Sequence, residues 1–189
     1  MQAFLIATGL VALAEIGDKT QLLAFMLAAR FRRPWPIVLG IFVATVFNHA
    51  AAGALGSWLT SLISPLALRW ILGLSFLAMA GWMLIPDKLD EDDTPKPGHG
   101  VFVTTVIAFF LAEMGDKTQI ATVALAARFH DLWSVVAGTT LGMMIADVPA
   151  VFIGDRLAKK IPMTLVHAIA AAIFAVLGLL TLFNVGSFF

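Results

Sequence analysis

Apolar residues occupy six long stretches of this chain, and shorter polar segments separate them. The stretches cover roughly 3–29, 37–60, 66–85, 101–127, 134–157 and 163–184. Each is close to or longer than the ~20 residues that an α-helix needs to cross a bilayer. The pattern predicts an all-α membrane protein with six transmembrane helices.

One of the polar segments differs from the others. Residues 86–100 are rich in acidic residues, proline and glycine, whereas the breaks at 30–36, 61–65, 128–131 and 159–162 are short. We interpret 86–100 as an acidic, solvated linker; a metal-gathering or regulatory loop is the alternative.

The composition agrees with a membrane location. The chain is 60% hydrophobic and 13% charged, whereas soluble domains are about half apolar and a quarter charged. The formal net charge is zero, so no electrostatic argument favours a nucleic-acid partner. Cysteine is absent, which excludes disulfides and thiolate metal ligands.

The chain contains an internal repeat with an offset of 98 residues. The segment LAEIGDKTQ at 13–21 recurs as LAEMGDKTQ at 111–119, and LAARF at 27–31 recurs at 125–129. Thirteen of the nineteen positions from 13 to 31 are identical in the second copy. Without gaps, the same register aligns Trp35 with Trp133, Gly40 with Gly138, Gly56 with Gly154, and Phe76 with Phe174.

This repeat predicts the domain organisation. Residues 1–85 form a first three-helix repeat, 86–100 a cytoplasmic linker and 101–189 a second three-helix repeat, within one integrated transmembrane domain. Because each unit has an odd number of spans, the second copy must be inverted in the membrane. Inverted repeats are typical of secondary transporters, which bind substrate at the midplane between the repeats. Gly138 and Gly142 form a GxxxG pair that favours close helix packing.

Basic residues predict the orientation. One membrane face collects eight of the twelve, namely Arg30, Arg32, Arg33, Lys88, Lys96, Arg156, Lys159 and Lys160, and the other collects Arg69 and Arg128. The basic face is expected to be cytoplasmic, so both termini are predicted to lie outside the cytoplasm.

Carboxylates inside the apolar stretches are the candidate site. Glu15 and Asp18 are three residues apart and would share one face of a continuous helix near mid-membrane; Glu113 and Asp116 repeat this in the second copy. Each charge at the bilayer centre costs at least about 2.5–3.5 kcal/mol. We therefore expect the four acids to converge and to bind a cation.

Lys19 and Lys117 offer a structural alternative, because each is four residues after a glutamate and could neutralise it within one helix. Even so, four carboxylates and two lysines carry a net charge of −2 when ionised. One divalent cation or two protons would balance that charge, which is the chemistry of a cation/proton exchanger.

The glycine between the acids, Gly17 or Gly115, admits two interpretations. It could open the helix so that a carbonyl faces the ion, as in broken transporter helices. It could equally serve close helix packing.

Other polar residues are possible supporting ligands, and they are Gln21, Gln119, Thr20, Thr118, Asp147, Asn48 and His49. The glutamines are favoured over the threonines, which could bond to carbonyls of their own helices. In the repeat register His49 aligns with Asp147. His49 is either a packing residue or a ligand or proton relay, and Asp147 is a stronger ligand candidate because it is an acid at mid-depth. Such an oxygen-rich set suits Ca²⁺, Mn²⁺ or Mg²⁺ rather than copper.

Two copies of Glu-x-Gly-Asp-Lys-Thr in a duplicated six-helix chain resemble the family of Golgi and bacterial calcium/manganese:proton exchangers, grouped with the LysE-type exporters. The resemblance covers nearly the whole chain. It implies that Glu15, Asp18, Glu113 and Asp116 form the metal site, with the motif lysines and threonines around it. It also implies export of Mn²⁺ or Ca²⁺ from the cytosol, driven by proton entry and without a permanently bound cofactor.

The sequence resembles the compact bacterial form rather than the eukaryotic members, which carry an additional N-terminal segment. This implies a multi-pass protein of the bacterial inner (plasma) membrane. A passive divalent-cation channel and a LysE-like small-solute exporter are the alternatives, although four convergent acids suit a zwitterion's carboxylate poorly. The sequence contains neither an HExxH metalloprotease motif nor a GxSxG nucleophile motif that would indicate an enzyme. Whether the protein is a monomer or a homodimer stays open.

Overall fold

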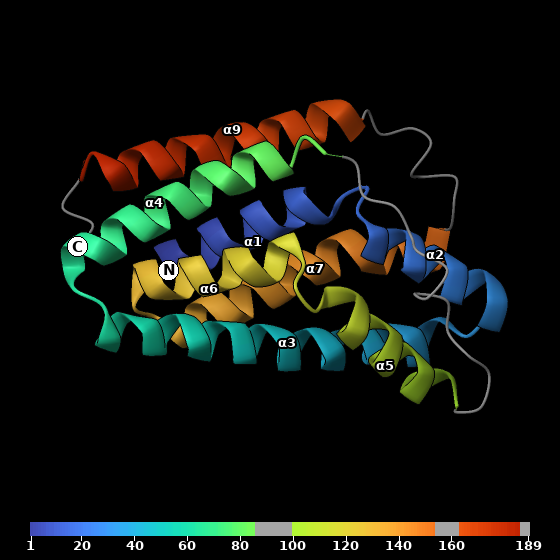
Figure 1. Ribbon diagram of the computed structural model, residues 1–189. Coiled ribbons are helices and arrows are strands. Elements are labelled where there is room, and N and C mark those ends of the chain that lie inside the picture. Colours follow the sequence, from blue (N-terminus) through green and yellow to red (C-terminus); the bar gives the residue numbers. More distant parts are fainter. Residues whose placement is uncertain (86–99, 154–162, 186–189) are drawn as a thin grey trace.

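The computed structural model describes residues 1–85, 100–153 and 163–185, and these fold into eight helices (Figure 1). They are α1 (Gln2–Glu15), α2 (Lys19–Phe31), α3 (Pro34–Leu62), α4 (Pro65–Trp82), α5 (Val101–Glu113), α6 (Lys117–Phe129), α7 (Leu132–Ile153) and α9 (Met163–Leu182). All but the last residue of the linker predicted at 86–100 lies outside the described residues.

Four of these helices are long and apolar enough to cross a membrane. They are α3, α4, α7 and the part of α9 from Thr164 to Leu182, while α1 and α5 are apolar but shorter. The predicted spans at 37–60, 66–85 and 163–184 correspond to α3, α4 and α9, and the span at 134–157 corresponds to α7 as far as Ile153. The fold is therefore all-α, as predicted.

The span predicted over 3–29 is not one continuous helix, because α1 ends at Glu15 and α2 begins at Lys19. Between them Ile16 has φ −64° and ψ 114°, Gly17 has φ 84°, and the N–H of Asp18 donates to the carbonyl of Glu15 at 3.1 Å. These are the features of a type II turn, which requires a residue with positive φ at its third position. Glycine adopts that conformation without steric cost.

The span predicted at 101–127 breaks in the same way. Met114 has φ −65° and ψ 117°, Gly115 has φ 77°, and the N–H of Asp116 donates to the carbonyl of Glu113 at 3.2 Å. Of the two interpretations of the motif glycine, the broken helix is therefore the one that the fold contains. At each break one helix ends and another begins beside buried acidic side chains, and the backbone groups at these ends lack partners within their own helices.

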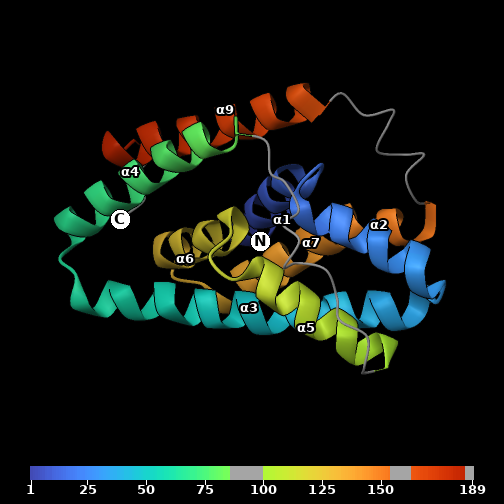
Figure 2. The same ribbon diagram turned by 45° about the vertical axis from the view of Figure 1, so that its right-hand side comes forward.

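The helices form layers (Figures 1 and 2). α4 and α9 lie side by side along one side of the molecule, α3 lies along the opposite side, and α1 and α6 lie between them. α4 and α9 run antiparallel, since Gly73 faces Leu182 while Gly178 faces Leu77. The rings of Phe76 and Phe174 are 6.3 Å apart.

α3 and α7 also run antiparallel. The ring of Trp35, at the start of α3, packs edge-on against Phe152, near the end of α7, with 5.6 Å between centroids. Since α3 and α7 are equivalent in the repeat, equivalent helices point in opposite directions.

Glycines allow the two repeats to pack closely on each other. A β-carbon added to Gly138 of α7 would lie 2.6 Å from the carbonyl oxygen of Phe4 in α1, and one added to Gly142 would lie 2.7 Å from that of Thr8. The close packing predicted for the GxxxG pair is thus confirmed. In the other repeat, a β-carbon on Gly40 of α3 would lie 3.1 Å from the carbonyl oxygen of Phe102 in α5.

We predict that Gly138→Ala destabilises the protein by about 1–3 kcal/mol, because the added methyl group overpacks the α1–α7 contact. The control is Gly9→Ala in α1, where an added β-carbon meets nothing within 4 Å. Thermal unfolding in detergent, followed by tryptophan fluorescence, should give a lowered Tm for Gly138→Ala and an unchanged or raised Tm for Gly9→Ala. Equal melting temperatures would contradict the close contact.

Candidate metal site

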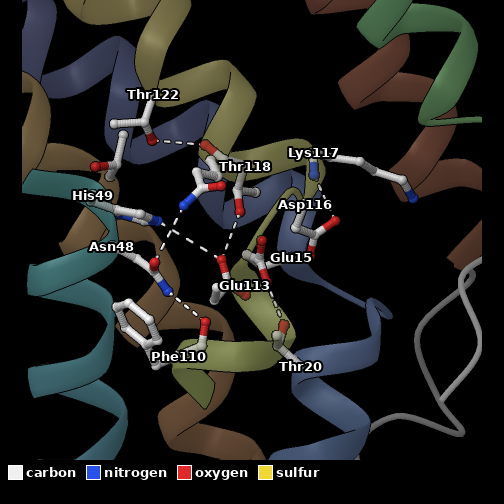
Figure 3. A network of polar contacts seen from close by, with 12 residues as sticks. Glu15, Thr20, Asn48, His49, Phe110, Glu113, Asp116, Lys117, Thr118 and Thr122 are labelled. Atoms are coloured by element: carbon white, nitrogen blue, oxygen red, sulfur yellow. Dashed lines mark hydrogen bonds and ion pairs between the residues drawn. The ribbon is translucent and has the colours of Figure 1, made fainter. Parts of the chain in front are cut away.

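The two helix breaks bring acidic side chains from both repeats together. Glu15 and Glu113 are the last residues of α1 and α5, and both are fully buried. Each of Glu15, Glu113 and Asp116 offers a carboxylate oxygen, and these oxygens lie within 4.8 Å of one another (Figure 3). The structure therefore brings three of the four predicted site acids together.

The motif threonines orient the two glutamates. The hydroxyl of Thr20 donates to Oε2 of Glu15 at 2.6 Å, and that of Thr118 donates to Oε2 of Glu113 at 3.1 Å. Oε1 of each glutamate is buried and has no hydrogen-bond partner among the described residues. Leaving a buried carboxylate oxygen unpaired is costly, and a bound cation removes that cost.

Asp18 and Asp116 precede α2 and α6, where the N-terminal ends of the helices favour negative charge. Oδ1 of Asp116 accepts the backbone N–H of Lys117 at 2.6 Å. Asp18 is as deeply buried as Asp116 but lies outside the group of three close oxygens. In this conformation the two aspartates are therefore not equivalent.

The motif lysines pair across the repeats. Nζ of Lys19 lies 3.8 Å from Oδ2 of Asp116, and Nζ of Lys117 lies 3.7 Å from Oδ1 of Asp18. The alternative of neutralising pairs within one helix does not describe this structure. It assumed an unbroken helix, whereas Glu15 and Lys19 belong to different helices.

The motif glutamines support the breaks. Oε1 of Gln21 accepts the N–H of Gly17 at 3.0 Å, and Oε1 of Gln119 accepts that of Gly115 at 2.7 Å. Nε2 of Gln21 donates to the carbonyl of Ala146 in α7 at 3.0 Å. Both amides are thus engaged, because Gln119 makes the corresponding contact with α3.

That contact involves residues predicted as possible ligands. Nε2 of Gln119 donates to Oδ1 of Asn48 at 3.2 Å, and Nδ2 of Asn48 donates to the carbonyl of Phe110 in α5 at 3.1 Å. Asn48 occupies the position equivalent to Ala146, so the glutamines bind equivalent places on α3 and α7. Asn48 thereby links α3, α5 and α6.

His49 and Asp147, which are equivalent in the repeat, are fully buried beside the glutamates. Nε2 of His49 is 4.0 Å from Oε2 of Glu113 (Figure 3). Asp147 is close enough for its charge to act on both Glu15 and Glu113. Neither carboxylate oxygen of Asp147 has a hydrogen-bond partner in the described part of the chain.

Sequence reasoning missed two contacts at the breaks. Nε2 of His167 in α9 lies 3.0 Å from the carbonyl oxygen of Ile16, and Nζ of Lys117 donates to the carbonyl of Ile85 at 3.3 Å. Each contact ties one end of the third helix of a repeat to a break. Neither His167 nor Ile85 lies in the repeated motif. No pattern in the sequence signals them.

A buried cluster of carboxylates at paired helix breaks among apolar helices is typical of a membrane transporter for a cation. Comparison with known proteins gives the family. Residues 3–91 and 101–187 match the family model described as "Divalent cation/proton antiporter GDT1", and the chain belongs to this family.

Individual relatives agree with this assignment. A protein of Vibrio cholerae named "Putative manganese exporter" is 51% identical over 97% of this chain and 92% of its own length. A GDT1-like protein of Synechocystis is 32% identical over 93% of this chain and 96% of its own. The "Divalent cation/proton antiporter GDT1" of Saccharomyces cerevisiae is 23% identical over 97% of this chain and 84% of its own. No solved structure matches the chain.

The family and the exchange of a divalent cation for protons are therefore confirmed as predicted from the doubled motif. The apolar helices and the family together make this an integral membrane protein.

We predict that Gly115→Ala lowers stability by about 1–2 kcal/mol, the cost of a left-handed conformation for a residue with a β-carbon. A β-carbon at this position would meet nothing within 4 Å, so the effect isolates backbone strain from collision. Gly115→Asn is the matched variant, because asparagine tolerates positive φ and should restore much of the loss. Thermal unfolding measures both, and Ala and Asn variants of equal stability would contradict the turn.

Proposed function

We propose that this protein exports Mn²⁺, Ca²⁺ or both from the cytosol in exchange for protons, with Glu15, Asp18, Glu113 and Asp116 as the metal site. The observation that carries the proposal is the buried group of Glu15, Glu113 and Asp116, with Oε1 of both glutamates unpaired among the described residues. The manganese assignment draws on the name of the Vibrio cholerae relative. The transported ion is the substrate, and no resident cofactor is part of the proposal.

The architecture that we propose is an inverted repeat of six spans. In residues 1–85, α1 and α2 together form the first span, α3 the second and α4 the third. In residues 101–189, α5 and α6 together form the fourth span, α7 the fifth and α9 the sixth. The antiparallel course of α3 and α7 supports it, and so does the contact between the equivalent rings of Phe76 and Phe174. When equivalent residues touch each other, they lie on a two-fold axis.

The crossed ion pairs support the same architecture. Lys19 contacts Asp116 and Lys117 contacts Asp18, so exchanging the two repeats exchanges one pair for the other. This reciprocity is the pattern of an interface with two-fold symmetry. The site therefore belongs to both repeats and exists only where they meet.

The orientation remains as proposed from the basic residues. Arg30, Arg32 and Arg33 follow the inner end of the first span, which puts both termini outside the cytoplasm under the positive-inside rule. The bacterial inner (plasma) membrane is the proposed location, on the strength of the close bacterial relative.

Charge balance supports exchange with protons. The four motif carboxylates and two lysines carry −2 when ionised, and Asp147 makes the sum −3. If the total charge of the site is the same in its metal-bound and proton-bound states, one divalent ion is replaced by two additional protons. In such a cycle each metal ion leaves against two protons, and the exchange moves no net charge.

The difference between the aspartates supports an alternating cycle. Here Asp116 offers an oxygen within 4.8 Å of both glutamates, whereas Asp18 lies outside this group, although its charge still acts on Glu113. Because the repeats share the motif, the reverse arrangement follows when each repeat adopts the conformation of the other. The ion would then keep both glutamates while the aspartates exchange, and the site would open to the other side.

We predict that Asp18→Asn and Asp116→Asn each abolish metal transport and leave the protein folded, because each keeps side-chain shape and removes one charge from the site. Asp18→Asn removes the charge that faces the buried Lys117, and Asp116→Asn removes the one that faces Lys19, so we expect a lowered Tm with the fold retained. The measurement is metal-driven proton release from proteoliposomes loaded with a pH dye, alongside thermal unfolding. Asp131→Asn is the control, because this residue lies between α6 and α7, and its Oδ1 accepts the N–H of Ser134 at 3.2 Å, which asparagine can also do. Flux near wild type in either site variant would remove that aspartate from the site.

We also predict electroneutral exchange of two protons for each divalent ion. Imposing a potassium diffusion potential of either sign with valinomycin should leave the initial rate of metal-driven proton movement unchanged. A rate that rises for one sign and falls for the other would contradict the proposed charge balance. A flux that needs no proton gradient and is not coupled to proton movement would instead favour a channel.

A further inference from the structure

The imidazole of His49 is an unusual neighbour for the carboxylate cluster. It lies in the middle of α3, is fully buried, and neither ring nitrogen has a hydrogen-bond partner among the described residues. Burying a polar group without a partner is costly, and a bound ion that accepts the ring nitrogen as a ligand would remove that cost. The side chain points toward Glu113 (Figure 3).

The distance between His49 and Glu113 fits two ligands of one metal ion. Nε2 and Oε2 are 4.0 Å apart, beyond the hydrogen-bond range of about 2.7–3.2 Å. Two donors each about 2.1 Å from one ion are separated by about 3.0 Å at right angles and by up to about 4.2 Å on opposite sides. An ion at Glu113 therefore has a nitrogen donor within reach.

We propose that His49 binds the transported ion through Nε2 and makes the site prefer Mn²⁺ over Ca²⁺; this inference rests on the proposed metal site. Ca²⁺ takes oxygen ligands almost exclusively, whereas first-row transition ions accept imidazole. The equivalent residue of α7 is Asp147, an oxygen donor. The two repeats thus give the site one nitrogen and one further carboxylate from equivalent positions.

His49→Gln tests the role, because it keeps a polar side chain of similar size and replaces the nitrogen donor by an amide oxygen. We expect Mn²⁺ affinity to fall about 10- to 100-fold, the range for altered metal surroundings, while Ca²⁺ affinity changes little. Isothermal titration of the purified protein with each ion gives the ratio. A ratio equal to that of wild type would overturn the proposal and leave His49 a packing residue.

A spectroscopic measurement separates ligation from packing. Electron spin-echo modulation of the Mn²⁺-loaded protein should show coupling to ¹⁴N in wild type and lose it in His49→Gln. His167→Gln is the matched control, since this histidine contacts the carbonyl oxygen of Ile16 instead, and its coupling should persist. If wild type binds Mn²⁺ without nitrogen coupling, the role of His49 is refuted while the proposed metal site stands. Failure of wild type to bind any divalent ion would refute the metal site itself.

Discussion

The rest of this structure depends on holding several carboxylates inside a membrane. An ionised carboxylate in apolar surroundings is expensive unless it is paired, hydrogen-bonded or bound to a cation. The chain meets this constraint in part. Threonine hydroxyls bind one oxygen of each glutamate, and lysines face the aspartates at 3.7 and 3.8 Å. The remaining glutamate oxygens have no such partner in the described structure, so they are available to a cation.

The helix breaks follow from the same constraint. In a continuous helix the backbone groups at this position would hydrogen-bond within the helix. A type II turn at Gly17 or Gly115 instead ends one helix and starts another beside the acids. The N–H groups freed at each turn need partners within a membrane. Gln21 and Gln119 supply them through Oε1 and anchor the turn to the opposite repeat through Nε2. We therefore interpret the glutamines as residues that position the site.

Sequence reasoning identified much of this arrangement, and its errors have one physical source. The repeat offset and the apolar stretches indicated α3, α4, α7 and α9, because those helices are long and apolar throughout. The breaks were missed as a definite prediction because a glycine costs a helix only about 1 kcal/mol, too little to decide between a turn and a packing contact. Once the helix is broken, Glu15 and Lys19 can no longer pair as neighbours on one helix. The crossed pairing then depends on tertiary contacts between repeats, and no local pattern encodes it.

The two halves of the candidate site differ in the residues that the second helix of each repeat contributes. The motif residues on α1, α2, α5 and α6 are nearly identical, so they alone would build a symmetrical site. α3 contributes Asn48 and His49 where α7 contributes Ala146 and Asp147. As a result, one glutamine binds a side-chain amide and the other a backbone carbonyl, and an imidazole faces one side of the cluster while a carboxylate lies at the equivalent position on the other. In the proposed mechanism, duplication supplies a site that opens to either side of the membrane, and divergence at these two positions is where its preference among cations can be tuned without disturbing the shared acids.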